Sequence, residues 1–555
     1  MAAAFFPLST SPPLLTRRPA AGLEHSRRPP RGQHGGCSAR RLPAAATAGA
    51  TRGLTRRATA AAAAAAQGRA LAGEGAEEGS LQMVLLSTAV AVCGSFEFGT
   101  CVGYSAPAQA GIVGDIGLSN SQYGIFASVL TVGAMVGALT SGRLADTLGR
   151  KMTMRLAAIV GIFGWLAIYL AKGATMLCLG RVLLGYCTGV LSYVVPVFIS
   201  EIAPKGLRGG LAASNQLFIC SGCSASYIIG ATIPWRSLVI VGLLPCVFLL
   251  VGLPFIPESP RWLANIGREK EFRASLQKLR GEKAEISGEA TEIIVGFYPK
   301  LLHLSTYNLG KRIFQKNNLL FLCRRTWNQF RIYLRPGFRI CFTGKICMQS
   351  FFDVQVGVGL KVFQQLGGIN ALGFYTSYIF SSAGFSGKLG TTLIGIIQIP
   401  ITLLGALLMD RSGRRTLLLV SSSGTFVGCF LTGLSFYFKA QGLYTQLVPT
   451  LALYGILAYY VAYSIGMGPV PWVIMSEIFS INMKGIAGSL VTLVSWVGSF
   501  VISYSFSFLM DWNSAGTFFL FSAASLVTVL FVARLVPETK GRTLEEIQES
   551  LMAGT

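Results

Sequence analysis

The stretch "GRLADTLGRK", Gly142 to Lys151, places four charged residues directly after a long apolar run. The shorter stretch "DRSGRR", Asp410 to Arg415, follows a later apolar run in the same way. Each stretch comes after the second apolar run in a set of six. The sequence therefore predicts a chain built from two related halves.

Two further pairs of motifs support this repeat. "SEIAPKGLRG" (Ser200 to Gly209) and "SEIFSINMKG" (Ser476 to Gly485) follow the fourth apolar run of each half, and "PESPRWL" (Pro257 to Leu263) and "PETKGRTLEEI" (Pro537 to Ile547) follow the sixth. Parallel repeats of this kind are a transporter architecture, in which the substrate site lies near the middle of the membrane between the repeats.

Apolar runs of membrane-spanning length recur along most of the chain. Of its 555 residues, 52% are hydrophobic and only 13% are charged, which is a membrane composition. A helical span needs about 20 mostly apolar residues. We predict an all-α membrane protein with twelve transmembrane helices in two six-helix repeats, the spans being residues 83–104, 122–142, 152–171, 177–199, 211–231, 236–256, 354–380, 389–409, 416–437, 447–470, 485–508 and 516–536.

The same pattern predicts five regions: a disordered N-terminal leader (1–80), an N-terminal six-helix bundle (81–256), a cytosolic connecting segment (257–353), a C-terminal six-helix bundle (354–536) and a cytosolic tail (537–555). The start of the leader is basic and poor in acidic residues, which is typical of an organelle transit peptide, of a disordered arm, or of a stretch absent from the mature protein. Block 295–352 is basic and has no acidic residue. It is either an insertion that binds anionic lipid or a translation of sequence not normally spliced into the message.

Lys and Arg fall mainly in alternate connections, so the net charge of +24 indicates membrane topology rather than nucleic-acid binding. The positive-inside rule places both termini in the cytosol. The 12 cysteines lie mostly within spans, and the C-x-x-C pair Cys220 and Cys223 has no further ligands in sequence. We predict no enzyme, no cofactor and no metal, because no nucleophile and base arrangement, phosphate loop or metal-ligand spacing is visible.

The motifs "GRLADTLGRK", "PESPRWL", "QQLGGIN" (Gln364 to Asn370), "GPVPW" (Gly468 to Trp472) and "PETKGRT" together resemble the sugar porter family of the major facilitator superfamily. "FEFGTCVGYSAP" (Phe96 to Pro107) is most similar to the plant early-responsive-to-dehydration-six-like monosaccharide transporters. The resemblance implies transport of a monosaccharide, a hexose such as glucose, by alternating access. It implies the vacuolar membrane, whereas the leader indicates a plastid envelope; the plasma membrane is a third option.

By this resemblance, the sugar contacts fall on amide and indole side chains. These groups offer neutral hydrogen bonds and flat apolar faces to a sugar. Each alone is equally explained as a polar contact between helices, whereas the set favours binding. The glycines in "QQLGGIN" and the glycines and prolines in "GMGPVPW" predict broken helices at the site. The expected substrate-binding residues are Gln216, Gln364, Gln365, Asn370, Gln398, Trp472 and Trp496.

The resemblance also implies a cytoplasmic ion-pair network that holds the two halves together in the outward-facing state. The alternative, that Lys and Arg only set topology, leaves the acidic members unexplained. We expect Arg181 to join this network or to extend to the membrane surface. The predicted members are Arg143, Asp146, Arg150, Glu201, Arg208, Arg261, Asp410, Arg414, Glu477 and Lys484.

The coupling mode is predicted as facilitated diffusion. Proton-coupled relatives carry an aspartate in the first span, and the aligned residue here is Cys101. Glu97, one helical turn earlier, is the alternative proton carrier, because a carboxylate within a span is a functional candidate by default. The competing functions are a proton-coupled sugar symporter and a sugar sensor that does not transport.

Lys361 is the exception among the polar residues of the seventh span. A charge within a span costs about 2.5 to 3.5 kcal/mol on insertion scales. Relatives resembling this chain tend to have an apolar residue there, so we predict that the seventh helix inserts poorly.

Overall fold

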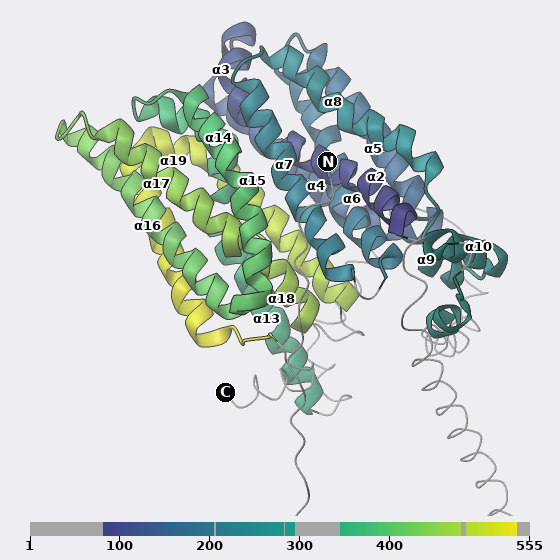
Figure 1. Ribbon diagram of the computed structural model, residues 1–555. Helices are drawn as coiled ribbons and strands as arrows, with labels where there is room; N and C mark the ends of the chain where they lie inside the picture. The colour runs from purple at the N-terminus through teal and green to yellow at the C-terminus, as the bar shows by residue number, and fades with distance from the viewer. Residues whose placement is uncertain (1–80, 205–206, 282–283, 295–343, 479–483, 541–555) are drawn as a thin grey trace, which may run out of the picture. The chain divides into compact units, whose positions relative to one another are not determined.

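The computed structural model describes residues 81–204, 207–281, 284–294, 344–478 and 484–540, which are almost entirely helical (Figure 1). The predicted leader (1–80), most of the basic block (295–343) and the end of the tail (541–555) lie outside the described residues. The predicted division of the chain into regions at residues 80, 256, 353 and 536 stays a prediction.

The N-terminal half contains the first six predicted spans and a short connecting region. The first span continues beyond a turn into a second helix, and two short α-helices follow the sixth span. The elements are α2 (Leu81–Gly103), α3 (Ser105–Ile116), α4 (Asn120–Leu148), α5 (Arg150–Tyr169), α6 (Ala174–Ile202), α7 (Arg208–Gly230), α8 (Trp235–Gly252), η1 (Leu253–Phe255), α9 (Pro260–Asn265) and α10 (Glu269–Arg280).

The C-terminal half contains the last six predicted spans, two of which are interrupted. Its first helix begins at Gly344, earlier than residue 354, the predicted start. The elements are α13 (Gly344–Leu366), α14 (Ile369–Ser382), α15 (Gly387–Ser412), α16 (Arg414–Gln441), α17 (Val448–Ala462), the π-helical turn η3 (Tyr463–Met467), α18 (Val470–Ile478) and α19 (Lys484–Leu535).

Nine segments of the described residues are long and apolar enough to cross a membrane. One of them, Leu490–Leu535, contains two predicted spans, which meet at the non-helical backbone of Asn513 (φ −158°, ψ 98°). The fifth span is the more polar helix α7, and the seventh is divided between α13 and α14. All twelve predicted spans therefore correspond to described helices.

The seventh span is broken by Gly367 and Gly368, as the sequence predicted. Gly368 has a φ of +85°, a conformation that only glycine adopts at little cost. A Cβ atom on Gly368 would also lie 2.6 Å from the Phe521 ring. The tenth span is broken by η3 and the residues that follow it.

Four apolar cores lie among the described residues, and three of them connect the spanning helices. The first contains residues of both halves, among them Tyr104 and Trp165 with Phe374 and Phe506. The second contains residues of the N-terminal half only, and the third contains residues of the C-terminal half only. The two halves therefore share one core and keep the other two separate.

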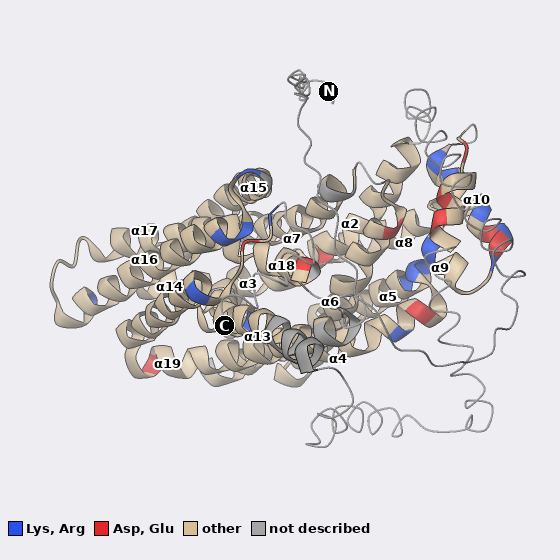
Figure 2. Ribbon diagram, turned by 90° about the horizontal axis from the view of Figure 1, so that it is seen from below, with Lys and Arg blue, Asp and Glu red and all other residues tan. Residues whose placement is uncertain are grey.

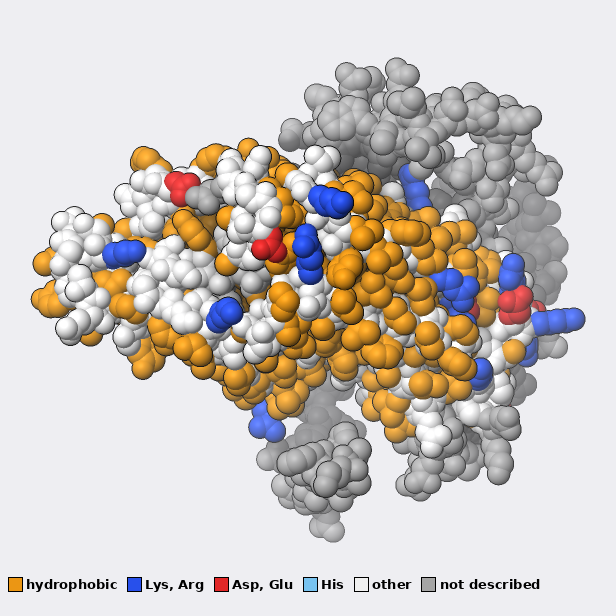
Figure 3. All heavy atoms as spheres, turned by 90° about the horizontal axis from the view of Figure 1, so that it is seen from above, with side chains coloured by type: hydrophobic (Ala, Val, Ile, Leu, Met, Phe, Trp, Pro, Cys, Tyr) orange, Lys and Arg blue, Asp and Glu red, His pale blue; other side chains and the backbone are white. Residues whose placement is uncertain are grey.

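Large apolar side chains cover the outer surface. Phe163, Phe248 and Leu407 are each 60% exposed or more, and Figure 3 shows apolar side chains over much of one face. Charged side chains gather instead on α9, α10 and neighbouring helix ends (Figure 2). An apolar outer face of this kind fits a lipid environment.

Candidate functional site

The seventh span has two amide side chains before its break, Gln364 and Gln365, and one after it, Asn370. Asn370 Nδ2 donates a hydrogen bond back across the break to Gln365 Oε1. Gln365 is buried, and its Nε2 donates to Ser495 Oγ on α19 at 3.1 Å. These contacts connect α14, α13 and α19 through side chains that can each bond a sugar hydroxyl instead.

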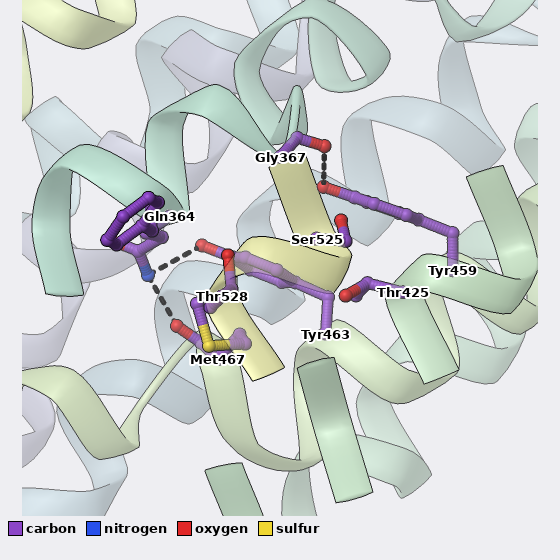
Figure 4. A pocket seen from close by; sticks show the side chains of 9 residues that line it. Gln364, Gly367, Thr425, Tyr459, Tyr463, Met467, Ser525 and Thr528 are labelled. Atoms are coloured by element: carbon purple, nitrogen blue, oxygen red, sulfur yellow. Dashed lines mark hydrogen bonds between the residues drawn. The ribbon is translucent and has the colours of Figure 1, made fainter. Parts of the chain in front are cut away.

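Gln364 connects the two broken spans. Its Nε2 donates to the hydroxyl of Tyr463 (3.0 Å) and to the carbonyl of Met467, both in η3 (Figure 4). The Tyr459 hydroxyl donates to the carbonyl of Gly367 at 2.9 Å. Backbone carbonyls left free by the two breaks thus receive hydrogen bonds from side chains, which is how irregular backbone is tolerated in a membrane.

A small cavity lies beside these residues. Its volume is about 10 Å³, room for about one water molecule and far too little for a sugar. The lining residues are Phe363, Gln364, Gly367, Thr425, Tyr459, Tyr463, Met467, Ser525 and Thr528 (Figure 4).

The two predicted indoles lie in different surroundings. Trp472 on α18 is 45% exposed, and the ammonium nitrogen of Lys361 lies 3.5 Å from its ring centroid. Trp496 on α19 packs against Phe98 on α2, with 6.2 Å between the ring centroids. Trp496 thus lies where the two halves meet.

Gln216 on α7 and Gln398 on α15 approach the same thiol. Gln216 Nε2 donates to Cys220 Sγ at 3.5 Å, and the side chain of Gln398 also lies beside that sulfur. Gln398 Oε1 is buried without a hydrogen-bond partner among the described residues. This group again combines amides from both halves and leaves one acceptor unused.

Lys361 lies inside the predicted site. Its side chain is only 1% exposed, and its Nζ donates to Gln364 Oε1 at 2.9 Å. An amide oxygen and the face of an indole replace the water that an ammonium loses on burial. Sequence reasoning identified the unfavourable burial of this charge but neither of its contacts.

The predicted ion-pair residues form two matching groups. Arg150 bonds Glu201 through two nitrogens, each at 2.9 Å, and lies 3.4 Å from Asp146. In the other half, Arg414 pairs with Glu477 at 3.1 Å. Each of these ion pairs lies within one half of the described chain.

Two further predicted members do not join these groups among the described residues. Arg143 and Arg261 are exposed, and the described ion pairs do not include them. The side chains of Arg208, Asp410 and Lys484 lie outside the described residues.

Glu258 and Glu538 are members of these groups that sequence reasoning missed. Glu258 accepts hydrogen bonds from the backbone N–H groups of Arg150 and Lys151 at the start of α5 (3.2 and 3.1 Å). Glu538 accepts the equivalent bonds from Arg414 and Arg415 at the start of α16 (2.9 and 3.1 Å). A carboxylate is stabilised at a helix N-terminus. The presence of a glutamate at the same position of "PESPRWL" and "PETKGRT" is the sequence signal that could have predicted this role.

These motifs differ electrostatically in the two halves. Burial raises the pKa of the Glu258 carboxyl, and backbone hydrogen bonds offset only part of that effect. Burial also acts to raise the pKa of Glu538, but backbone hydrogen bonds outweigh it and hold that pKa below its ordinary value.

The residue after each of these glutamates contacts the ion-pair group of its own half. The Ser259 hydroxyl donates a hydrogen bond to Glu201 at 2.6 Å, and the Thr539 hydroxyl donates one to Glu477 at 2.5 Å.

The expectation for Arg181 is wrong. Its side chain is fully buried, and it donates to the carbonyl of Cys101 (2.8 Å) and to the Ser105 hydroxyl. Its guanidinium lies 4.8 Å from the centroid of the Phe126 ring. Local acceptors and an aromatic face stabilise the charge in the bundle, so Arg181 neither joins the ion-pair network nor reaches the membrane surface.

Glu97 is enclosed within the N-terminal half. Its Oε1 accepts hydrogen bonds from Trp165 Nε1 (2.7 Å) and Cys101 Sγ (3.2 Å), and its Oε2 has no partner among the described residues. A carboxylate oxygen of Glu97 and the sulfurs of Cys187 and Cys246 lie within 4.8 Å of one another. A carboxylate and thiols are donor types of zinc sites, and the sequence did not predict this grouping because the residues lie in different spans.

Comparisons with known proteins identify relatives of this chain. The sequence model of the family described as "Sugar (and other) transporter" matches residues 74–316 and 341–551. Sugar transporter ERD6-like 16 of Arabidopsis thaliana is 52% identical over 477 residues, which cover 86% of this chain and 92% of that protein. ERD6-like 8 of the same plant is 49% identical and covers 86% of this chain and 95% of that protein.

Solved structures give the same fold. The inward-open conformation of the xylose transporter XylE from E. coli matches with a TM-score of 0.65 and 24% identity, over 84% of this chain and 99% of that one. Its partially occluded inward-open conformation matches with a TM-score of 0.64 and 22% identity, over 82% of this chain and 100% of that one. At these identities the likeness shows the fold alone.

Proposed function

Because the chain belongs to the sugar transporter family, we propose that it carries monosaccharides, hexoses such as glucose, across a membrane by alternating access. The observation that carries the proposal is that neutral amide and indole side chains from both halves meet. Gln216 and Gln398 approach one thiol from opposite halves, and Trp496 packs against Phe98. A site divided between two repeats is exposed to either side in turn when the repeats move against each other.

The three apolar cores support alternating access. The shared core includes Leu118, Trp235 and Ala383, at the opposite ends of the helices from the ion-pair motifs. The cores confined to one half include Ile202 and Ile478, next to Glu201 and Glu477. We interpret this arrangement as a state in which the halves are closed against each other at the end that carries the shared core. In this state the ion pairs at the opposite end join residues of the same half and do not join the two halves.

Uptake of radiolabelled hexose by a transport-deficient cell tests the transport proposal. We expect saturable uptake that Gln365→Ala abolishes while membrane expression is unchanged, because Gln365 offers both a donor and an acceptor to the sugar. Uptake that is insensitive to Gln365→Ala argues against this site, and binding without flux argues for a sensor.

We propose facilitated diffusion as the mode of transport. Proton-coupled relatives have an aspartate at the first-span position that aligns with Cys101. Cys101 has no carboxylate, and Arg181 donates a hydrogen bond to its backbone carbonyl instead. Proton symport through Glu97 is the second candidate, supported by the buried carboxylate oxygen that has no described partner. Proteoliposome uptake with and without a pH gradient separates the two, since accumulation of sugar against its own gradient requires coupling.

We propose that the protein lies in the vacuolar membrane with both termini in the cytosol. The distribution of Lys and Arg over alternate connections supports this orientation. The predicted partners are the monosaccharide and the lipid bilayer, with protons only under symport and with no nucleic acid. A fluorescent fusion in plant cells tests the compartment, and signal at the plastid envelope favours the transit-peptide interpretation of the leader.

A further inference from the structure

Lys361 brings a positive charge into the proposed sugar site. Its Nζ lies 2.9 Å from Gln364 Oε1 and 3.5 Å from the centroid of the Trp472 ring. The other proposed sugar contacts are neutral amides and indoles. The charge therefore lies among the groups that we expect to contact the substrate.

No carboxylate balances this charge among the residues that the structure describes. The described ion pairs do not include Lys361, and its hydrogen-bond partner Gln364 is neutral. A carboxylate stabilises a buried ammonium more strongly than an amide or an aromatic ring does, because it supplies a full opposite charge as well as a hydrogen bond. A negatively charged ligand would supply what the protein lacks here.

Lys361 also occupies groups that a neutral sugar would need. It uses the Gln364 acceptor, while the Gln364 amide nitrogen is bonded to Tyr463 and Met467. It covers one face of the Trp472 indole, although that side chain remains 45% exposed. A neutral hydroxyl competes weakly for the ammonium, whereas a substrate carboxylate can draw it away and free both groups.

We infer that Lys361 makes this transporter selective for monosaccharides that carry one carboxylate, the hexuronates, over neutral hexoses. The inference rests on the proposed sugar transport. A single negative charge fits better than a phosphate, because Arg181, the other fully buried cation of the described spans, is bonded to Cys101 and Ser105. One ammonium then balances one carboxylate.

Uptake by the purified full-length chain in proteoliposomes tests the inference. At about pH 7, where a uronic acid is ionised, glucuronate should be transported with a kcat/KM at least about tenfold above that of glucose. Lys361→Met, which keeps the side-chain length and removes the charge, should lower the ratio of glucuronate uptake to glucose uptake at least about tenfold. Glucuronamide, the neutral analogue, should compete no better than glucose.

Lys388→Met is the matched control, since Lys388 is exposed at the start of α15, and it should leave the ratio of the two sugars unchanged. A wild-type preference for glucose that Lys361→Met does not alter overturns the inference. Stronger competition by glucose 6-phosphate than by glucuronate overturns the assignment to a carboxylate. Uptake of glucose alone defeats only this inference, whereas uptake of neither sugar also defeats the proposed transport function.

Discussion

At the scale of single residues, Glu258 and Glu538 show how one motif acquires different properties in two halves. Both carboxylates cap the start of a helix that follows a glycine with positive φ, Gly149 or Gly413. A Cβ atom on either glycine would lie within 2.8 Å of the capping carboxylate. The carboxylates differ in burial, which raises the pKa of Glu258, whereas backbone hydrogen bonds lower that of Glu538.

We expect Glu258→Gln and Glu538→Gln to change stability with opposite dependence on pH. A carboxyl with a lowered folded pKa stabilises the protein above its unfolded value, about 4.3, and this contribution is lost as the pH falls through the folded value. Glu538→Gln should therefore be most destabilising near neutral pH. For Glu258, whose pKa is raised, the wild type should lose stability relative to Glu258→Gln as the pH rises above about 4.3. Melting temperatures in detergent across this range measure both trends, and parallel trends contradict the assignment.

Lys361→Met should raise the yield of protein in the membrane. The substitution removes a buried charge whose insertion costs about 2.5 to 3.5 kcal/mol, and methionine fills a similar volume. The lost contact with Trp472 offsets part of the gain, because a desolvated cation over an aromatic ring contributes about 2 kcal/mol. Quantitative blotting of membrane fractions measures the yield, and an unchanged or lower yield argues that the present contacts fully compensate the charge.

Sequence reasoning identified the polar residues of this region but not their partners. Gln364, Gln365 and Asn370 are conspicuous because they interrupt an apolar run. That Gln364 bonds Met467, or that Lys361 lies over Trp472, depends on how two broken helices pack, which local sequence does not encode. The prediction for Arg181 was wrong for the same reason, because its hydrogen-bond acceptors lie in α2 and α3, far from it in the sequence.

At the scale of elements, the break between α13 and α14 depends on one glycine. Gly368 is the N-cap residue directly before α14, has a φ of +85° and lies against the ring of Phe521. The carbonyl of Gly367 is free to accept from Tyr459 only because the helix is interrupted there. The break therefore positions Gln365 and Asn370 to meet across it.

Gly368→Ala should destabilise the protein and impair sugar uptake, whereas Gly373→Ala should do neither. The first substitution imposes a strained φ, which costs about 1 to 3 kcal/mol, and a clash with Phe521. Gly373 lies within α14 with nothing within 4 Å of an added Cβ, so alanine should be neutral or stabilising by up to about 1 kcal/mol. Thermal unfolding and uptake of both variants check this, and equal effects would remove the special role of Gly368.

The breaks were predictable because glycines next to each other, or glycines together with prolines, weaken a helix locally. Single prolines were weaker signals, since Pro196, Pro245 and Pro400 lie inside helices. Element boundaries were less predictable. α13 begins at Gly344, and Lys345 is within it, because basic residues are compatible with a helix extending beyond the apolar span. The last two spans are two helices that meet at the non-helical backbone of Asn513 without an intervening loop.

At the scale of the whole transmembrane region, the repeat was readable from sequence, but the contacts between the halves were not. The three motif pairs lie at corresponding positions in both halves. Which ends of the helices share a core is a property of one conformational state, and a sequence encodes every state of the transport cycle at once.

Contacts across the shared core hold the described state together. The Tyr227 hydroxyl on α7 donates to the carbonyl of Gly373 on α14 at 2.8 Å. The rings of Tyr123 on α4 and Tyr375 on α14 lie 6.0 Å apart. Both contacts join the N-terminal half to the C-terminal half, and both must break when the shared end opens. Their strength therefore sets part of the balance between the two end states.

Tyr227→Phe should shift this balance towards the state in which the shared end is open. It keeps the apolar ring in the core and removes one hydrogen bond between the halves, worth about 1 kcal/mol or about fivefold in population. Hydrogen–deuterium exchange in detergent should then be faster in peptides from α3 and α14, which contact each other at this end. Tyr437→Phe, at an exposed position on α16, removes the same hydroxyl without touching the shared core and should leave exchange unchanged. Equal exchange in the two variants shows that the Tyr227 hydroxyl does not favour either state, and that the closed end depends on apolar packing alone.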